Sequence, residues 1–344
     1  MEAFELIRIF TFLTLSFLLA KFLTPFCFKL ILKLNLKKHI KKENAPIYSS
    51  LHLHKEGTPT CGGIIVWSSA AILIFLIFIL GKIFDGFFKA LDPINRAQTY
   101  LPMAAFFGAA LLGLADDLLG ILGYDRKIIT VPRKIFIYSL IAFVGALWFY
   151  LKLDWDVIYL PILGLFHFSW LYIFLFALVM IFCAFSSNET DGLDGLCGGT
   201  MLISFIPLIV FSFCLHRYDL AAFLAIIVGA LVAFLWENVY PAKFFGGDTL
   251  SMSLGICFGV VLMLTNTLWL LPFLGIVFFL ESGSVILQLF SKKFFKRKIF
   301  ISTPIHHHFE AQGISEPKIV FWFWIIQAIG SSLALIFFFL DKFI

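Results

Sequence analysis

Charged residues are scarce in this 344-residue chain: 14% are Asp, Glu, Lys or Arg, against 61% that are hydrophobic. Soluble domains contain about a quarter charged residues, so the shortage of charge excludes an ordinary soluble protein. The six cysteines are scattered and include no CxxC pair, which argues against a disulfide framework or a cysteine zinc site. No internal repeat or long linker divides residues 1–344, and we expect a single domain.

Long apolar runs dominate the sequence instead, and its mean hydropathy is +0.99. Because a membrane-spanning helix needs about 20 apolar residues, these runs predict an all-α polytopic membrane protein with about ten transmembrane helices. Basic residues follow the first run rather than precede it, so we interpret this run as a retained anchor and not a signal peptide. The expected spans are roughly residues 4–26, 62–81, 101–115, 134–151, 170–187, 197–215, 220–236, 250–265, 268–290 and 318–340.

Lys and Arg are distributed unequally between the two sets of loops. Loops 29–60, 116–134, 187–196, 237–249 and 291–318 together contain 18 of them, whereas the opposite loops contain 5. Basic loops of membrane proteins face the cytoplasm. We therefore expect the first set to be cytoplasmic and both termini to be external. The net charge of +5 is explained by these loops and does not indicate nucleic-acid binding.

Five polar segments interrupt the apolar runs, and all five lie in the basic set of loops. A membrane protein that gathers carboxylates, amides and histidines on one face is expected to perform chemistry there. The segments are residues 52–60, 116–117, 188–195, 238–248 and 304–310.

Two of these segments are rich in carboxylates. Asp116 and Asp117 are adjacent at a membrane boundary, where their charges repel unless a cation or partner is close. A solvated helix end is one interpretation, and a Mg²⁺ or general-base site is the other. Segment 188–195 contains Glu189, Asp191 and Asp194 with no basic residue. A simple turn needs fewer carboxylates, so this segment favours a metal or hydrogen bonds to a sugar or base.

The other segments supply a flexible backbone, aromatic groups and cations. The glycines at 246–247 allow a turn that presents Asp248 at the start of a span. Phe245 suits either interfacial packing or stacking on a planar base. The three histidines at 306–308 suit phosphate binding or proton transfer better than zinc, because consecutive residues rarely face one metal. Lys55 is a candidate cation for binding phosphate. Its loop lacks the GxxxxGK(S/T) spacing of a Walker phosphate-binding loop.

These parts together favour phosphoryl transfer between a soluble nucleotide and a phosphate carried by a lipid, which needs charge neutralisation and positioning. A secondary transporter is the alternative from another class. Transporters usually bind their substrate near the midplane between repeats, whereas here the carboxylates lie at span ends.

The order and spacing of the motifs resemble the phospho-N-acetylmuramoyl-pentapeptide transferases, a branch of the polyprenyl-phosphate N-acetylhexosamine-1-phosphate transferase superfamily. The resemblance covers nearly the whole chain. It implies transfer of phospho-MurNAc-pentapeptide from UDP-MurNAc-pentapeptide to undecaprenyl phosphate, with Mg²⁺, in the bacterial plasma membrane, by a homodimer. The segment at 304–310 resembles the muramoyl branch, and a UDP-GlcNAc transferase remains the alternative. The motifs that carry the resemblance are residues 55–63, 116–117, 188–195, 238–243, 247–249, 304–310 and 316–318.

The same resemblance implies roles for individual residues. Asp248 would hold Mg²⁺ together with Asn188, and Asp116 would deprotonate or position the acceptor phosphate beside Asp117. The implied catalytic set is Asp116, Asp117, Asp248, His306 and His307. The implied substrate-binding set is Lys55, Thr60, Lys134, Asn188, Asp191, Gly192, Leu193, Asp194, Asn238, Phe245 and His308.

The chain departs from the family pattern at two positions. Where the family commonly reads Asp-Asp-x-x-Lys, this sequence has Gly120, so the role of that lysine is lost or has moved to Arg126, Lys127 or Lys134. This departure keeps a catalytically inactive relative as a further alternative. Leu250 stands where a glycine often follows the Asp-Thr pair. The sequence does not separate direct transfer from a two-step route through an aspartyl-phosphate.

Overall fold

The computed structural model describes residues 2–37, 52–84, 86–95, 97–121, 131–152 and 155–343. Within these ranges, the side chains of 54, 131–138, 141 and 343 are not described. The side chain of Lys134, and the whole of Arg126 and Lys127, therefore lie outside the described part of the chain.

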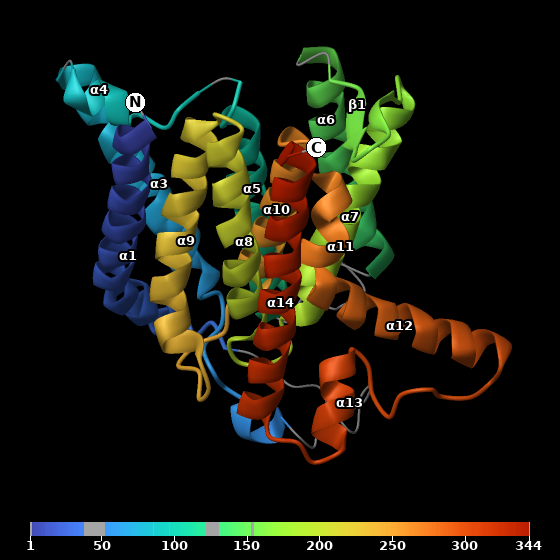
Figure 1. The fold of residues 1–344 in the computed structure, drawn as a ribbon. Helices are drawn as coiled ribbons and strands as arrows, with labels where there is room; N and C mark the ends of the chain where they lie inside the picture. Colours follow the sequence, from blue (N-terminus) through green and yellow to red (C-terminus); the bar gives the residue numbers. More distant parts are fainter. Residues whose placement is uncertain are drawn as a thin grey trace.

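Helices make up nearly all of the regular structure (Figure 1). The α-helices are α1 (Glu2–Lys33), α3 (Gly63–Ile83), α4 (Phe87–Leu91), α5 (Tyr100–Ile121), α6 (Val131–Lys152), α7 (Leu171–Thr190), α8 (Leu196–Cys214), α9 (Tyr218–Asn238), α10 (Asp248–Leu264), α11 (Leu271–Leu274), α12 (Ile276–Phe294), α13 (Ile305–Ala311) and α14 (Glu316–Phe343). The shorter elements are the 3₁₀ turns η1 (Leu53–Lys55) and η2 (Leu268–Leu270) and the strands β1 (Val157–Leu160) and β2 (Gly164–His167).

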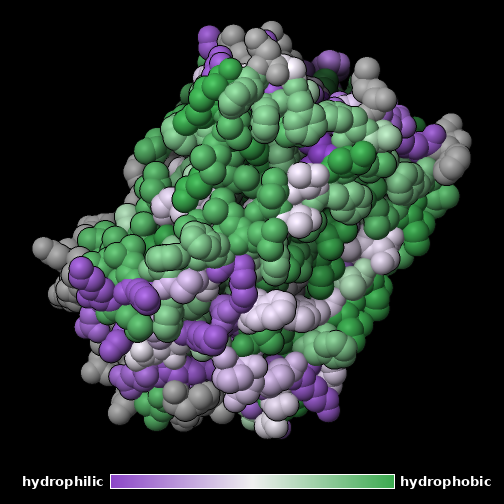
Figure 2. All heavy atoms as spheres, turned by 90° about the vertical axis from the view of Figure 1, so that its left-hand side faces the viewer, coloured by the Kyte–Doolittle hydropathy of each residue, from purple (hydrophilic) through white to green (hydrophobic). Residues whose placement is uncertain are grey.

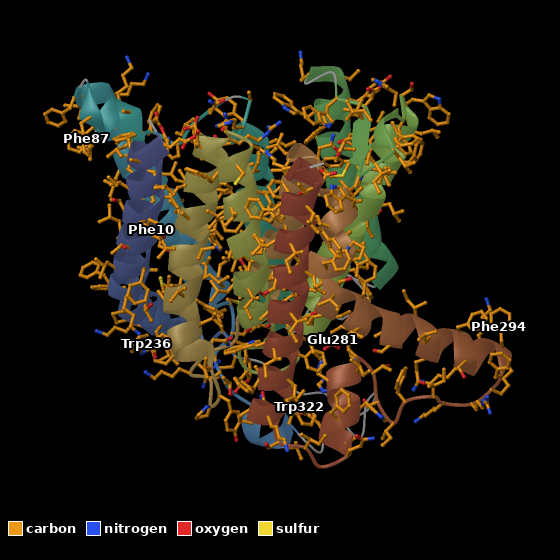
Figure 3. The ribbon with its side chains drawn as sticks, viewed as in Figure 1. Phe10, Phe87, Trp236, Glu281, Phe294 and Trp322 are labelled. Atoms are coloured by element: carbon orange, nitrogen blue, oxygen red, sulfur yellow. The ribbon has the colours of Figure 1, made fainter. Side chains whose placement is uncertain are left out.

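The all-α membrane fold is confirmed. Nine of the ten expected spans each fall on one helix, and the span at 268–290 is broken. In the described residues, seven helices are long and apolar enough to cross a membrane, and a bent pair would make eight. The bent pair corrects the expected span at 268–290. The chain turns by 79° between Leu268–Leu274 and Ile276–Phe294, because Gly275 ends α11 and begins α12. Helix α12 consequently projects sideways from the bundle, with Phe294 at its outer end (Figure 3).

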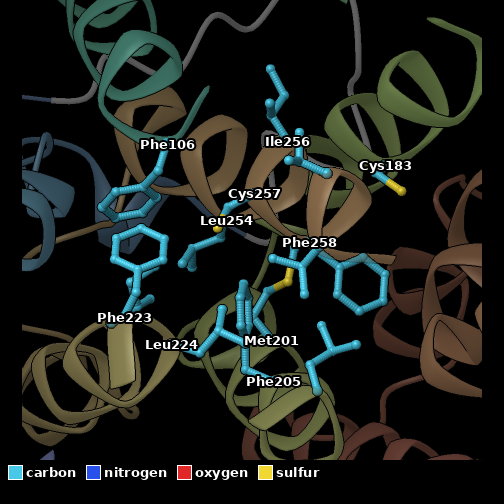
Figure 4. Close-up of a cluster of buried hydrophobic side chains, with 14 of the residues drawn as sticks. Phe106, Cys183, Met201, Phe205, Phe223, Leu224, Leu254, Ile256, Cys257 and Phe258 are labelled. Carbon is cyan, nitrogen blue, oxygen red and sulfur yellow. The ribbon is translucent and has the colours of Figure 1, made fainter. Parts of the chain in front are cut away.

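Helices α9 and α10 form the centre of the bundle. The most apolar part of α9 is 83% buried, and nearly every residue of α10 is buried as well. Their apolar side chains meet those of α5 and α8 in one cluster (Figure 4). The rings of Phe106 and Phe223 lie 6.2 Å apart, and those of Phe205 and Phe258 lie 6.1 Å apart. A helix that is apolar on all sides has to be surrounded by other helices or by lipid, and α10 is surrounded by helices.

Exposed apolar side chains cover the middle of the outer surface, as expected for a face in contact with lipid. Figure 2 shows this band on the side formed by α1, with hydrophilic residues gathered towards the two ends of the molecule. On α1 the exposed positions include Ile7, Phe10, Leu18, Phe22 and Phe26. Such a band would be unstable in water, and it supports the membrane assignment.

The close packing around α10 depends on a glycine of α5. A Cβ atom at Gly113 would collide with the backbone of Asp248 and lie 2.7 Å from the Cα atom of Thr249. The absence of a side chain therefore lets α5 touch the first residues of α10. This contact brings the carboxylates at the end of α5 to the start of α10.

The two ends of the bundle contain different structural elements. Both termini lie at one end, together with the antiparallel hairpin in which Val157 pairs with His167 and Leu160 with Gly164 (Figure 1). This hairpin was not predicted by the sequence analysis, and its two strands are only four residues each. Helix α13 and the turn η1 lie at the opposite end, where the polar segments of the sequence meet.

Candidate active site

The five polar segments meet at this end, as their grouping in one set of loops predicts. Residues far apart in the sequence are joined by hydrogen bonds: His52 to Glu310, Lys55 to Asp194, and Asn188 to Asp248. A fourth hydrogen bond joins Asp117 to the backbone of Asp248, and the four bonds together link all five segments. The site is therefore built from all five segments and not from a single motif.

Asp117 binds the first turn of α10. The backbone N–H of Asp248 donates to its Oδ1 atom at 3.0 Å, and that of Thr249 donates to its Oδ2 atom at 3.1 Å. The first N–H groups of a helix have no partner within the helix and carry partial positive charge, so they favour a carboxylate. Gly247 makes this approach possible, because it has a φ of +77° and a Cβ atom there would collide with Asp117.

Asp248 faces the amide of Asn188, whose Nδ2 atom donates to Oδ1 of Asp248 at 2.7 Å. Asp116 and Asp248 both lie close enough to Asp117 to repel its charge. Three carboxylates and one amide thus gather where α5, α7 and α10 meet. Oxygen ligands of this kind suit Mg²⁺, so the donor set fits the predicted cofactor.

The neighbouring Cys61 is not a nucleophile in this arrangement. Burial, followed by the negative charge and hydrogen bond of Asp117, raises the pKa of the Cys61 thiol. A protonated thiol is a weak nucleophile. The cysteine therefore serves as a small buried group beside the carboxylates.

Lys55 lies in a buried ionic cluster. Its Nζ atom donates to Oδ1 of Asp194 at 2.7 Å and to Oε1 of Glu316 at 2.5 Å. The backbone N–H of Ala242 also donates to Asp194, at 3.0 Å. Burial by itself would lower the pKa of Lys55, but the charges of Glu316 and Asp194 outweigh it, and the pKa is raised. The ammonium group remains charged and lies 5.8 Å from the ring centre of Phe245.

Phe245 and Lys55 therefore lie together, as a base-binding pocket would require. The ring of Phe245 is partly exposed, and its backbone is held by a hydrogen bond to the carbonyl of Pro59 at 2.9 Å. Thr60 is buried in the same loop. Asn238 holds two backbone groups: its Oδ1 atom accepts from Gly195 at 3.1 Å, and its Nδ2 atom donates to Phe244 at 2.9 Å. In this structure Asn238 fixes the backbone at Gly195 and Phe244.

The loop after α7 places three predicted residues in different surroundings. Asp191 ends the helix and is partly exposed. Gly192 lies directly against the ring of His306, where no side chain would fit. Leu193 is 3% exposed and packs with Val277, Ile319 and other apolar residues. The side chain of Leu193 is therefore part of the apolar packing.

The three consecutive histidines face different partners. The Nδ1 atom of His306 lies 2.9 Å from Oε2 of Glu281, and both side chains are 0% exposed. His307 bonds Glu310, whereas His308 accepts from the backbone N–H of Ile301 at 3.2 Å. The prediction that consecutive histidines would not share a metal agrees with this arrangement. The role of each one in substrate binding stays a prediction.

Glu310 accepts hydrogen bonds from two histidines on one oxygen. Its Oε2 atom lies 2.6 Å from Nδ1 of His307 and 3.1 Å from Nε2 of His52. Burial alone would raise the pKa of Glu310, but these hydrogen bonds outweigh it and lower the pKa to about 2. Burial and the charge of His306 lower the pKa of His307 to about 3. The group has ligand types that zinc accepts, but its ligand atoms bind one another, and we assign no metal to it.

The two departures from the family pattern differ in their surroundings. Gly120 is exposed, and a Cβ atom there would meet nothing within 4 Å. Leu250 is 1% exposed and packs against the backbone of Gly63. The leucine is part of the helix packing, whereas the position of Gly120 is open to a longer side chain. The side chain of Lys134, a predicted ligand of the lipid phosphate, lies outside the described residues.

The sequence analysis assigned no site role to two acidic residues that lie here, although Glu316 belongs to the motif at 316–318. Glu316 completes the cluster around Lys55, and Glu281 pairs with His306. Glu281 is the only charged residue in the expected span at 268–290. A carboxylate inside an apolar run is costly and usually functional, so this signal was present in the sequence.

Comparison with known proteins shows the family of the chain. Residues 99–266 match the family model described as glycosyl transferase family 4. Three curated relatives are each named phospho-N-acetylmuramoyl-pentapeptide-transferase. The protein of Dictyoglomus thermophilum is 37% identical over 91% of this chain and 95% of its own length. Those of Clostridium perfringens and Geobacillus thermodenitrificans are 34% and 33% identical, over 94% of this chain and 96% and 95% of their own lengths. The chain belongs to the phospho-N-acetylmuramoyl-pentapeptide-transferase family.

Proposed function

We propose that this protein transfers phospho-MurNAc-pentapeptide from UDP-MurNAc-pentapeptide to undecaprenyl phosphate and releases UMP. The observation that carries the proposal is the meeting of Asp116, Asp117 and Asp248 at one end of a membrane bundle, in a chain of this family. A lipid phosphate reaches such a position from the membrane and a nucleotide reaches it from the water.

The proposed reaction is a direct displacement. An oxygen of the lipid phosphate attacks the β-phosphorus of the donor, and the bond from that phosphorus to the bridging oxygen breaks as UMP leaves with the electron pair. Asp116 orients or deprotonates the acceptor phosphate from the last turns of α5. Asp117 holds the start of α10 and so keeps Asp248 in place. Trapping a phosphorylated Asp116 or Asp117 after denaturation would favour the two-step route instead.

Mg²⁺ is part of the proposal. Asp248, with Asn188 beside it, would hold the ion, because both belong to the oxygen-rich group where α7 and α10 meet. When bound, Mg²⁺ would supply neutralisation of the charge on the diphosphate. The chain's own residues bind and orient the two substrates around this position.

The donor is proposed to bind in the loops around Lys55. Uracil stacks on Phe245 and contacts the backbone at Gly192 and Leu193. Lys55 and Asp194 fix these loops through their buried ion pair. Asp191, Asn238, Thr60 and the histidines at 306–308 complete the diphosphate and sugar side. Lys134 is proposed to contact the lipid phosphate.

We further propose that the site faces the cytoplasm of a bacterial cell and that both termini are external. The proposal rests on the excess of Lys and Arg in the loops at the site end. A homodimer, which the family resemblance implies, belongs to the same proposal. Cross-linking in native membranes tests the dimer independently of activity.

The alternative donor is UDP-GlcNAc. The segment at 304–310 resembles the muramoyl branch, and the curated relatives bear its name. A donor comparison therefore separates the two branches. Release of UMP with UDP-GlcNAc and undecaprenyl phosphate, and not with the muramoyl donor, would contradict the proposal.

The test is UMP release by the purified protein with undecaprenyl phosphate and UDP-MurNAc-pentapeptide, in Mg²⁺ and in EDTA. Asp248→Asn is expected to abolish Mg²⁺-dependent release while the protein remains folded. Asp341→Asn is the matched control, because Asp341 accepts a hydrogen bond from Tyr159 at the opposite end. Equal activity of Asp248→Asn and the control would contradict the assigned site.

A further inference from the structure

Glu281 and His306 form a buried pair between two elements that the sequence separates. Glu281 lies six residues after the bend at Gly275, on α12, and His306 lies on α13. The Nδ1 atom of His306 is 2.9 Å from Oε2 of Glu281. A carboxylate only accepts hydrogen bonds, so this geometry fixes the Nδ1 proton on His306.

Each partner of this pair has one polar atom left over. Within the described residues, six buried side-chain nitrogen or oxygen atoms have no hydrogen-bond partner, and two of them are Nε2 of His306 and Oε1 of Glu281. Buried polar atoms are nearly always bonded, and an unbonded one costs stability unless it has a function. Two such atoms in one pair beside the proposed site indicate an interaction that another molecule completes.

The free nitrogen of His306 faces the loop proposed to bind the donor. A Cβ atom at Gly192 would overlap Nε2 of His306, so this nitrogen lies against the backbone of that loop. Phosphate oxygens are strong acceptors, and a histidine N–H bonds them well when it is charged.

We infer that Glu281 is a positioning residue that orients His306 and keeps its Nε2 proton available to a phosphate oxygen of the donor. The inference deepens the proposed function and rests on it. The groups that face His306 are mainly acidic: Glu281 from α12, Glu310 from its own helix and Glu189 from α7, with His307 as the basic neighbour. This surrounding charge favours the imidazolium form, which has a proton on both nitrogens.

The position of His306 also depends on the bend before α12, because Glu281 lies on that helix. The next residue, Ser282, donates a hydrogen bond to the hydroxyl of Ser186 on α7 at 2.7 Å. Glu281 thus lies at the inner end of α12, which is fastened to the bundle (Figure 3). The 79° turn at Gly275 brings the carboxylate to the histidine.

The test compares three variants in the UMP-release assay. Glu281→Gln keeps the shape of the side chain and removes its charge, and Glu281→Asp keeps the charge. Ser284→Ala removes a buried hydroxyl that donates to the backbone carbonyl of Glu281 at 2.7 Å, and so tests a change at this point of α12 that leaves the carboxylate in place. For Glu281→Gln we expect kcat to fall roughly 10- to 100-fold with KM for the donor nearly unchanged, since the contact strengthens as charge develops on the leaving phosphate. Glu281→Asp should recover part of the loss, and Ser284→Ala should match the wild type.

A second measurement reads His306 directly. The chain has eight histidines, and in ¹⁵N-histidine-labelled protein His306→Gln identifies the signals of His306. The wild type should show Nε2 protonated near neutral pH, and Glu281→Gln should shift it towards the unprotonated form. An unchanged His306 signal alongside lost activity would assign Glu281 a purely structural role and overturn the inference. Wild-type kcat in Glu281→Gln would overturn it as well. A wild-type protein that releases no UMP would instead contradict the proposed function itself.

Discussion

Arg8 and Lys55 each lie buried between two carboxylates, at opposite ends of the same bundle. Arg8 binds Glu5 at 3.0 Å and Asp219 at 2.7 Å. Lys55 binds Asp194 at 2.7 Å and Glu316 at 2.5 Å. Both clusters therefore contain one cation and two anions, and their composition alone does not distinguish them.

The difference lies in which parts of the chain each cluster joins. Arg8 and Glu5 share one helix, and Arg8 also bonds the backbone of Asp92, so this cluster fastens helix ends. The partners of Lys55 belong to separate segments next to the proposed donor loops. They are also more deeply buried: Asp194 and Glu316 are 4% and 8% exposed, against 14% and 22% for Glu5 and Asp219. The cluster around Arg8 therefore stabilises the packing of helix ends. The cluster around Lys55 is proposed to hold the loops of the site in place.

The largest expected effect is a difference in UMP release between variants of two carboxylates, one at each end of the bundle. Asp117→Asn should lower UMP release by at least about 100-fold, because the carboxylate holds the start of α10 beside Asp248. Asp219→Asn should leave the activity per folded molecule unchanged, although Asp219 accepts from Arg8 and from Asn95 at 2.8 Å. Steady-state rates normalised to folded protein check both. Equal losses in the two variants would remove the functional distinction between the ends.

The next effect concerns the two cations. Breaking a buried ion pair by removing one partner typically costs about 3–5 kcal/mol, and we expect Lys55→Met to lower the free energy of unfolding by about this amount. Arg8→Met should cost less, because its partners are more exposed. Thermal unfolding in detergent measures both. Only Lys55→Met should also raise the KM for the donor, and a comparable rise in Arg8→Met would contradict the comparison.

The dependence of stability on acid pH tests the Glu310 cluster at the site end. The pKa of Glu310 is lowered from 4.5 to about 2, so its contribution to stability is fully present above pH 4.5 and is lost as pH falls towards 2. Glu310→Gln should therefore show a flatter decline of stability over this interval than the wild type. Unfolding midpoints measured from pH 6 downward check this expectation. Parallel curves would mean that the bonds from His52 and His307 contribute little.

The smallest effect is expected at Gly120. The position is open, one turn beyond Asp117 on α5, so Gly120→Lys would place a cation near the proposed acceptor phosphate. We expect KM for undecaprenyl phosphate to fall a few-fold. Gly120→Ala is the control, because it improves helix propensity by about 1 kcal/mol without adding charge. The same KM in both variants would show that charge at this position has no role.

Much of the architecture was predictable from hydropathy. Apolar runs predicted each helix of the bundle, and the distribution of Lys and Arg predicted that the polar segments would meet at one end. The broken span at 268–290 was not predicted, because apolar residues lie on both sides of Gly275 and the bend there leaves no change in hydropathy. The hairpin at 157–167 was missed for the related reason that four-residue strands have too little pattern to detect.

The sequence by itself determined which residues enter the membrane and which segments are polar, because both follow from local composition. It also indicated, through motif order, a family that the comparisons then established. Only the tertiary structure decided which partners these residues have. Asp117 binds α10 across 131 residues, and Glu281 meets His306 across a helix bend. Such pairs depend on how helices pack, and packing depends on contacts between distant residues that no local pattern records.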